Sequence, residues 1–307
     1  MSRLFVAGLI NLETTLAIDG FPLPYFPVRY PFFGIQTTVS GVGYNLAKAL
    51  TRLGNQVDFA SLIGGDDNSQ LVRKALKGDG IGDGLILSTV NETAQSVIIY
   101  DPEGKRQIHT DLKDIQNQSY PLKEAEAALR QADLAVICNI NFARPLLRAA
   151  KSAGKWVATD VHALSDLDDA YNQDYMQAAD ILFLSDESLP EPPETILPEL
   201  MDKYSAEIIV IGLGAEGAAM GVRSDTHLEW FPAVQTRPVI NTIGAGDALF
   251  SAFLDHYVRT HDPYASIRAA IVFASYKIGE KGAAQGFLTA EALDEWVKKV
   301  ETDSSNN

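Results

Sequence analysis

The chain has 307 residues, 46% of them hydrophobic and 21% charged, which is typical of a globular protein with one large α/β domain or two smaller domains. Twenty-five basic residues against 40 acidic ones give a net charge of −15, which disfavours a nucleic-acid partner. No apolar stretch reaches the roughly 18 residues that a membrane helix needs. The single cysteine, Cys138, fits a reducing compartment, and the very short apolar run near Met1 lacks the features of an export signal, so we expect a cytoplasmic protein.

Short runs rich in β-branched residues predict buried strands over residues 57–63, 134–140, 156–161, 181–184 and 208–211. Helices are expected between them. Residues 44–53 place apolar side chains on one helical face and end at Gly54, and another helix starts near Pro145 and stops at Gly154. Strands that alternate with helices imply βαβ units, and therefore an α/β fold whose mostly parallel sheet is covered by helices on both faces.

Two segments interrupt this alternation. Residues 12–39 are rich in proline and aromatic residues, and residues 94–112 read as a hairpin with strands over 96–100 and 105–110. They are either surface loops or the strands of a small β lid that closes over a site and excludes water. Apolar patterning continues to Val297, so we expect a single domain over residues 1–307 with this lid inserted in it.

Arg106 lies on the second arm of the predicted hairpin. It could neutralise an acidic or phosphorylated substrate, or it could be a solvated charge on an edge strand.

The most informative segment is Gly244-Ala245-Gly246-Asp247, which opens an apolar-striped helix. Its glycines expose backbone N–H groups at a helix N-terminus, where the helix dipole also favours an anion. A carboxylate would repel a bound phosphate and be a poor ligand for it, but it suits a general base that takes a proton from a hydroxyl attacking phosphorus. The competing interpretation is that Asp247 only caps its helix.

A second glycine-rich helix start, Gly41-Val42-Gly43-Tyr44-Asn45, occurs much earlier in the chain. It is either an ordinary helix start with a packing glycine or one half of a site. Two such starts suit a reaction in which two polar ligands meet over one sheet.

Other patterns carry less weight. Gly212-x-Gly214-x-x-Gly217 fits the dinucleotide fingerprint, but residues 218–222 predict a strand where that fingerprint requires a helix, so NAD binding is disfavoured. Asn139 and Asn141 stand at the end of the predicted strand 134–140, where they either line a substrate pocket or form a turn. The five histidines and the one cysteine show no zinc-binding spacing.

Four motifs occur in order along nearly the whole chain: Gly8-x-x-Asn11-x-Glu13, Gly41-x-Gly43-x-Asn45, Ile63-Gly64-Gly65-Asp66-Asp67 and Gly244-Ala245-Gly246-Asp247. In this ordered set the chain resembles the ribokinase-like (PfkB-type) carbohydrate kinases. The resemblance implies a three-layer α/β/α sandwich with a mostly parallel central sheet and a small β lid. It also implies phosphorylation of a hydroxymethyl group by ATP with Mg²⁺.

The resemblance further implies roles for individual residues. It makes Asp247 the catalytic base and Gly244, Ala245 and Gly246 the anion hole for the transferring phosphoryl group. Substrate contacts are expected from the motif residues Asn11, Glu13, Gly41, Gly43 and Asn45 and, at its strand end, from Asn139. Nucleotide contacts are expected from Ser185, Gly212, Gly214, Gly217 and Thr242.

The chain departs from the family pattern at several positions. Glu13 stands where the family usually has aspartate. Asn241 replaces the acid that opens the Asp-Thr-x-Gly-Ala-Gly-Asp motif and that serves a monovalent-cation site in some members, which argues against cation activation. The Asn-x-x-Glu element linked to magnesium reads Ser185-Asp186-Glu187-Ser188, so Asp186 or Glu187 could hold Mg²⁺ through water. The family's Thr-x-Gly reads Gly212-Leu213-Gly214 and lacks the threonine hydroxyl.

We therefore expect an ATP-dependent kinase that phosphorylates a primary hydroxyl of a small sugar or sugar-like substrate. A nucleoside kinase of the adenosine or pseudouridine type is an alternative, because the aromatic residues of 21–33 could stack on a base. A protein of the same fold that binds a sugar or nucleotide without turnover is a second alternative, motivated by the changes at Asn241, Ser185 and Ser188. From the resemblance we also expect a homodimer formed through the lid, with no membrane partner.

Overall fold

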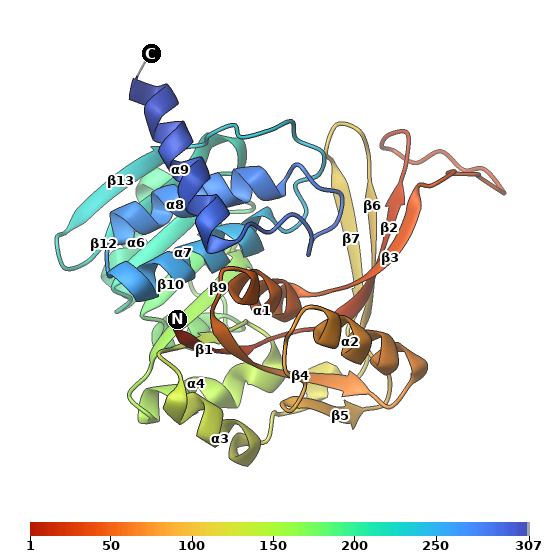
Figure 1. Cartoon of the computed structure of the whole chain (residues 1–307), viewed down its shortest axis with the longest axis horizontal. Helices are drawn as coiled ribbons and strands as arrows, with labels where there is room; N and C mark the ends of the chain where they lie inside the picture. Colours follow the sequence, from red (N-terminus) through yellow and green to blue (C-terminus); the bar gives the residue numbers. More distant parts are fainter. Residues whose placement is uncertain (306–307) are drawn as a thin grey trace.

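The computed structural model describes residues 1–305, and its centre is a nine-stranded sheet (Figure 1). The strand order is β13-β12-β11-β10-β9-β8-β1-β4-β5. All neighbours from β11 to β5 pair in parallel, whereas β12 pairs antiparallel with β11 and β13. The strands are β1 (Arg3–Ala7), β4 (Gln56–Gly64), β5 (Ile86–Val90), β8 (Leu134–Ile137), β9 (Trp156–Ala163), β10 (Ile181–Ser185), β11 (Ile208–Gly212), β12 (Gly217–Val222) and β13 (His227–Pro232).

Helices cover both faces of this sheet. Alternate side chains of β1 enter two separate cores: Leu4 and Val6 lie in one, Phe5 and Ala7 in the other. The first core is closed by α1 (Val42–Arg52), α2 (Asp67–Gly78), α7 (Ala245–Thr260), α8 (Pro263–Lys277) and α9 (Ala290–Ser305). The second is closed by α3 (Leu122–Gln131), α4 (Arg144–Ser152), α5 (Gln173–Ala178) and α6 (Pro193–Lys203). The predicted three-layer α/β/α sandwich is confirmed.

A second, four-stranded sheet stands at one side of the large one, as Figure 1 shows. Its order is β3-β2-β6-β7, built from β2 (Asn11–Ala17), β3 (Ile35–Ser40), β6 (Gln95–Tyr100) and β7 (Arg106–Asp111). Both segments that interrupted the sequence pattern thus supply strands to one small sheet, as the lid interpretation requires. Residues 18–34 are the exception, since they connect β2 to β3 without forming a strand.

The predicted strand 134–140 is too long. Strand β8 ends at Ile137, and the chain then turns, with the Ile140 amide donating to the Cys138 carbonyl at 2.8 Å before the short 3₁₀ turn Asn141–Ala143. Apolar side chains continue past the end of the strand because Cys138 and Ile140 remain buried in the turn. Hydrophobicity alone therefore did not locate the strand end.

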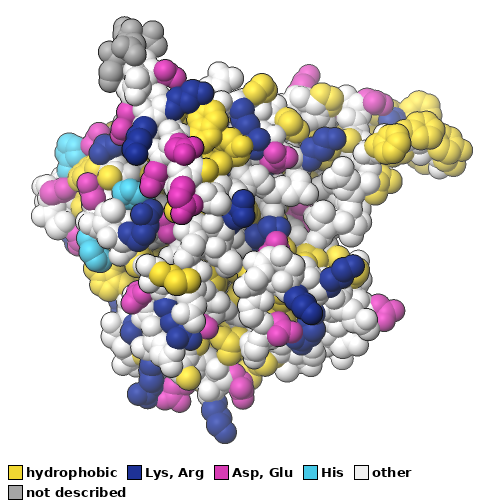
Figure 2. Space-filling view, in the orientation of Figure 1, with side chains coloured by type: hydrophobic (Ala, Val, Ile, Leu, Met, Phe, Trp, Pro, Cys, Tyr) yellow, Lys and Arg dark blue, Asp and Glu magenta, His cyan; other side chains and the backbone are white. Residues whose placement is uncertain are grey.

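The β2–β3 connection exposes an unusual number of large apolar side chains. Tyr25, Phe26, Tyr30, Phe32 and Phe33 are 60–98% exposed. Figure 2 shows them as a hydrophobic projection beyond the body of the protein. Exposed apolar patches of this kind on a globular protein commonly mark a contact surface. Among the helices of residues 1–305, none combines the length and apolar character required to cross a membrane.

Candidate active site

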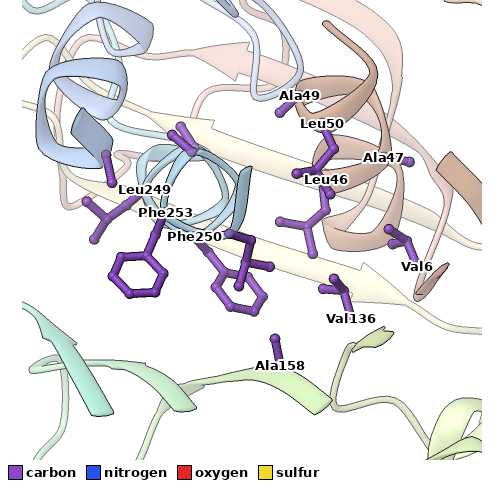
Figure 3. Packing of buried hydrophobic residues seen from close by; sticks show 14 of the residues in the cluster. Val6, Leu46, Ala47, Ala49, Leu50, Val136, Ala158, Leu249, Phe250 and Phe253 are labelled. Atoms are coloured by element: carbon purple, nitrogen blue, oxygen red, sulfur yellow. The ribbon is translucent and has the colours of Figure 1, made fainter. Parts of the chain in front are cut away.

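The two glycine-rich helix starts meet in space. Helices α1 and α7 pack side by side over β1, β8 and β9, where Figure 3 shows Leu46 and Leu50 of α1 near Phe250 of α7. At the N-terminal ends of these helices, Asn45 Nδ2 donates a hydrogen bond of 2.7 Å to Asp247 Oδ2. Residues 202 positions apart are thus brought into direct contact at the centre of the molecule. At the other end of the pair, Asn55 Nδ2 donates to Asp255 Oδ1, also at 2.7 Å.

The loop before Asp247 presents unpaired backbone donors. Gly244 is the N-cap of α7 and adopts a left-handed conformation with φ of 76°, and a Cβ there would lie 2.7 Å from the Ala283 carbonyl oxygen. The Ala245 and Ala248 amides donate within this turn, to Thr242 and Gly244. Within residues 1–305, the amides of Gly244, Gly246 and Asp247 have no hydrogen-bond partner. Free amides at a helix N-terminus can bind an anion, so this loop stays the predicted anion site.

Asp247 itself is 9% exposed and polar groups surround its carboxylate. Burial raises its pKa above the usual aspartate value, and the nearby Asp160 adds to this effect. The hydrogen bond from Asn45 has the largest opposing effect, and His162 and Lys277 act in the same direction as that bond. The capping alternative does not hold, because Gly244 occupies the N-cap position and the Asp247 carboxylate contacts a different helix.

Two polar residues of the small sheet lie buried with unpaired oxygens. Glu13 and Asn11 on β2 are 6% and 3% exposed, and Glu13 Oε1 and Asn11 Oδ1 have no partner among the described residues. Burial raises the pKa of Glu13, while a hydrogen bond with Ser40 lowers it and the charge of Asp247 raises it further. Since buried polar atoms are almost always hydrogen-bonded, these two oxygens fit ligand hydroxyls.

Gly43 lets helix α1 approach the end of β1. A Cβ at Gly43 would lie 2.4–2.7 Å from backbone atoms of Gly8, and a Cβ at Gly8 would lie 2.8 Å from the Gly43 Cα atom. Gly41, the N-cap of α1, has φ of 104°, a conformation that favours glycine. These glycines therefore allow the close helix–strand packing that places Asn45 beside Asp247.

The small sheet also reaches residues 242–247, which are called the anion loop below because they are the predicted anion site. Arg106 on β7 donates from Nη1 to Thr242 Oγ1 at 3.0 Å, and its Nη2 lies 3.9 Å from a carboxylate oxygen of Glu187. Ile98 on β6 packs in a small cluster with Ile243 and Ala283. Arg106 is thus more than a solvated edge charge, since it links the lid to the loop that carries the free amides.

The expected nucleotide residues lie at the ends of adjacent strands. Ser185 ends β10 and Gly212 ends β11, and the Asp186 amide donates to the Gly212 carbonyl at 3.0 Å. Gly214 opens a 3₁₀ turn, and Gly217 starts the antiparallel strand β12 rather than a helix. A dinucleotide fingerprint turn is therefore absent from this segment, in agreement with the sequence argument.

Two carboxylates are available for Mg²⁺ on this side. Asp186 and Glu187 follow β10, and Glu187 lies close to Arg106 and so to the anion loop. The described residues contain no group of three or more metal-ligating side chains. This donor set fits Mg²⁺, because that ion is commonly held by one or two carboxylates together with water and substrate phosphates.

The side chains of Asn139 and Asn141 are hydrogen-bonded to segments that are distant in the sequence. Asn139 Nδ2 donates to Asn172 Oδ1 at 3.0 Å, and Asn141 Nδ2 donates to the Gln116 carbonyl at 3.1 Å. Both lie at the carboxyl ends of the parallel strands, the edge where open α/β sheets bind ligands. The structure does not bring either side chain into hydrogen-bond contact with Asp247.

Sequence reasoning missed one buried group. Lys277, the last residue of α8, is fully buried and electrostatically coupled to both Asp247 and Glu13. Its signal was present, because Lys277 follows Ala270 and Phe273 at the helical spacing of the buried face of α8. A lysine on such a face requires a partner, and that rule would have identified it.

This geometry supports one kind of chemistry. A buried carboxylate beside free amides can remove a proton from a hydroxyl while the amides hold negative charge that develops on a neighbouring group. The unpaired acceptors of β2 can orient a polyhydroxyl ligand, and the small sheet can cover it.

Comparison with known proteins identifies the family to which the chain belongs. The family model "pfkB family carbohydrate kinase" matches residues 1–290. The acarbose 7(IV)-phosphotransferase of Actinoplanes sp. is 25% identical over 94% of this chain and 96% of its own length. The ATP-dependent ribose-1-phosphate kinase of Halopiger xanaduensis is 25% identical over 95% and 97%. Among solved structures, the microbiome-derived acarbose kinase Mak1 aligns with a TM-score of 0.86 and 25% identity over 97% of this chain and 99% of its own. The chain therefore belongs to the pfkB family of carbohydrate kinases.

Proposed function

We propose that this carbohydrate kinase transfers the γ-phosphoryl group of ATP to a primary hydroxyl of a small sugar or sugar-like substrate, with Asp247 as general base. The observation that carries the proposal is the buried Asp247 carboxylate beside the unpaired amides of Gly244, Gly246 and Asp247. The hydroxyl proton passes to Asp247 as the oxygen attacks the γ-phosphorus, and the bond from that phosphorus to the bridging oxygen breaks so that ADP leaves. The amides hold the charge on the phosphoryl oxygens.

Residues around this centre supply binding and exclude water. The unpaired oxygens of Asn11 and Glu13 support the role of β2 in binding substrate hydroxyls. The small sheet would shield the transferring group from water, which would otherwise accept the phosphoryl group. Ser185, Gly212, Gly214, Gly217 and Thr242 would line the nucleotide side. Bound Mg²⁺ would neutralise phosphate charge, and Asp186 and Glu187 would hold it, directly or through water.

Two observations bear on the class of acceptor: the substrates for which the relatives are named, and the position of Arg106. One relative is named for acarbose and another for ribose 1-phosphate, so large and phosphorylated sugars both occur as acceptors among similar enzymes. Arg106 Nη1 lies beside Thr242 in the anion loop, where a guanidinium could also contact a phosphorylated acceptor. A nucleoside acceptor remains the alternative, supported by the aromatic residues of the β2–β3 connection.

A panel of acceptors tests the proposal. Ribose, fructose, 2-keto-3-deoxygluconate, ribose 1-phosphate, acarbose, adenosine and pseudouridine are each incubated with MgATP, and ADP release and the phosphorylated product are measured. Turnover with a sugar supports the proposal, and turnover with a nucleoside alone supports the alternative. Ligand-induced thermal stabilisation without ADP release across the panel would instead indicate a binding protein without turnover.

The hydrogen bond from Asn45 is expected to lower the pKa of the proposed base, Asp247. Because its hydrogen bond lowers the pKa of Asp247, Asn45→Ala should raise that pKa further. A base works only when ionised, so the acid limb of kcat/KM against pH should move to higher pH. Asn55→Ala is the matched control, since it removes the second Asn–Asp hydrogen bond of the same helix pair without touching Asp247. An acid limb that moves equally in both variants, or in neither, would contradict this role.

We also propose that the protein forms a homodimer through its lid. The exposed aromatic side chains of the β2–β3 connection, together with Val97 on β6 and Ile108 on β7, form a hydrophobic surface on the small sheet and its connection. Light scattering should give the mass of two chains, and Phe32→Asp combined with Phe33→Asp should give the mass of one. A monomeric wild-type protein at micromolar concentration would contradict the proposal.

A further inference from the structure

Lys277 holds the only fully buried positive charge in the described part of the chain. Its side chain is 0% exposed, while every other lysine and arginine of residues 1–303 retains some solvent contact. Burial of a lysine is costly unless the ammonium is paired. The surrounding groups must therefore compensate for it, and they belong to the active site.

The ammonium contacts the anion loop directly. Lys277 Nζ donates a hydrogen bond to the carbonyl oxygen of Ile243, the residue immediately before Gly244. The amide of the same residue is held from the other side, since Ile243 N donates to Asn241 Oδ1 at 2.9 Å. Asn241 Nδ2 in turn donates to the Lys281 carbonyl at 3.0 Å, a bond that an ionised aspartate could not make. Both the carbonyl and the amide of Ile243, which leads into the free amides, are thus held by hydrogen bonds.

The charges around Lys277 come from four other segments. Asp247 on α7, Glu13 on β2 and Glu280 after α8 favour the ammonium form, whereas Arg106 on β7 disfavours it. Burial is the largest effect and lowers the pKa of Lys277 to about 8. Two buried carboxylates, Glu13 and Asp247, therefore share one internal cation next to the site of phosphoryl transfer.

We propose that the Lys277 ammonium is an internal cation that positions the Ile243 carbonyl and, through it, the following residues Gly244–Gly246 of the anion loop. It supplies from the chain itself the monovalent charge and carbonyl contact that a bound K⁺ or NH₄⁺ ion would otherwise supply. Lys277 is a positioning residue under this proposal, because it acts on the phosphoryl group through the loop. The inference rests on the kinase activity but not on the identity of the acceptor.

Shortening this side chain creates a specific test. Lys277→Ser removes the charge and leaves space for a small cation, whereas Lys277→Met removes the charge but keeps most of the volume. Lys298→Met, at an exposed position on α9, is the control for loss of a lysine. Turnover and Tm are measured in choline chloride and in KCl or NH₄Cl at equal ionic strength.

The proposal predicts a distinct pattern of salt responses. Wild-type kcat should be the same in choline chloride and KCl, and Lys298→Met should behave likewise. Lys277→Ser and Lys277→Met should lose roughly 100-fold in kcat in choline chloride, as expected when a catalytic loop is misplaced. KCl or NH₄Cl should restore at least tenfold to Lys277→Ser and nothing to Lys277→Met. The wild-type rate should fall above pH about 8, where the ammonium loses its proton, and the K⁺-rescued serine variant should not show that fall.

Three results would overturn the proposal. They are near-wild-type kcat in Lys277→Met, a wild-type rate that rises tenfold with KCl, and a Lys277→Ser variant that responds to KCl in neither kcat nor Tm. The Tm measurement needs no acceptor, because a cation that binds the serine variant should raise its Tm and leave that of the wild type unchanged. The proposal can therefore fail independently of the acceptor assignment.

Discussion

Replacing Asp247 with asparagine is expected to lower kcat by roughly 10²–10⁴-fold, the range of general-base catalysis, and to raise Tm at the same time. The stability gain follows from the raised pKa of the buried carboxyl. A raised pKa favours folding only while the group is protonated, and this contribution is lost as pH rises through the folded-state pKa. Above that pKa the wild type buries an ionised group at a cost, which asparagine removes. Calorimetry and steady-state kinetics on the same preparation measure both effects.

Asp255→Asn provides the matched control for this prediction. Asp255 lies two turns further along α7, is 1% exposed, and accepts hydrogen bonds from Asn55 and from Arg259 Nη2 at 2.8 Å. Its replacement should lower Tm, because a paired buried charge is lost, and should leave kcat within a few-fold of the wild type. If both variants behaved alike in kcat, Asp247 would have no special part in the reaction.

Gly43→Ala is expected to have the largest effect on folding. The new Cβ would overlap backbone atoms of Gly8 at 2.4 Å, so helix α1 would have to move away from β1. We expect the free energy of unfolding to fall by about 3 kcal/mol, at the upper end of the cost of overpacking. The shift of α1 should also separate Asn45 from Asp247 and lower kcat in the protein that remains folded. Denaturant titration and kinetics measure the two effects.

Gly78→Ala separates packing from the general effect of replacing a helical glycine. Gly78 ends α2, and a Cβ there would meet no atom within 4 Å. This control should be neutral or slightly stabilising, since alanine restricts the unfolded chain. Equal stability of Gly43→Ala and the wild type would mean that the close approach of α1 to β1 is not required.

Local sequence patterns located several elements of this fold to within a few residues. Helix α1 was expected over 44–53 and spans Val42–Arg52, and β11 was expected over 208–211 and spans Ile208–Gly212. Such patterns work because hydrophobic periodicity and terminal glycines act over a few residues. The predicted end of β8 was wrong, because hydrophobic residues stay buried after the hydrogen bonds of the strand have stopped.

Contacts between distant segments were harder to predict. The two helix starts were recognised separately, but the hydrogen bond between Asn45 and Asp247 depends on how α1 and α7 cross the sheet. The pattern of α8 could have shown that Lys277 is buried, but not that its ammonium meets the Ile243 carbonyl, on a segment before α7. The contact of Arg106 with Thr242 likewise arises only when the small sheet is placed beside the large one.

The most direct test of the central claim is a crystal structure of the protein with its acceptor and a non-hydrolysable ATP analogue. The account predicts the reacting hydroxyl within hydrogen-bond distance, about 2.6–3.2 Å, of an Asp247 carboxylate oxygen. It also predicts the γ-phosphate analogue on the amides of residues 244–247. A complex in which the acceptor hydroxyl faces another base, with Asp247 separated from it by protein side chains, would contradict the account.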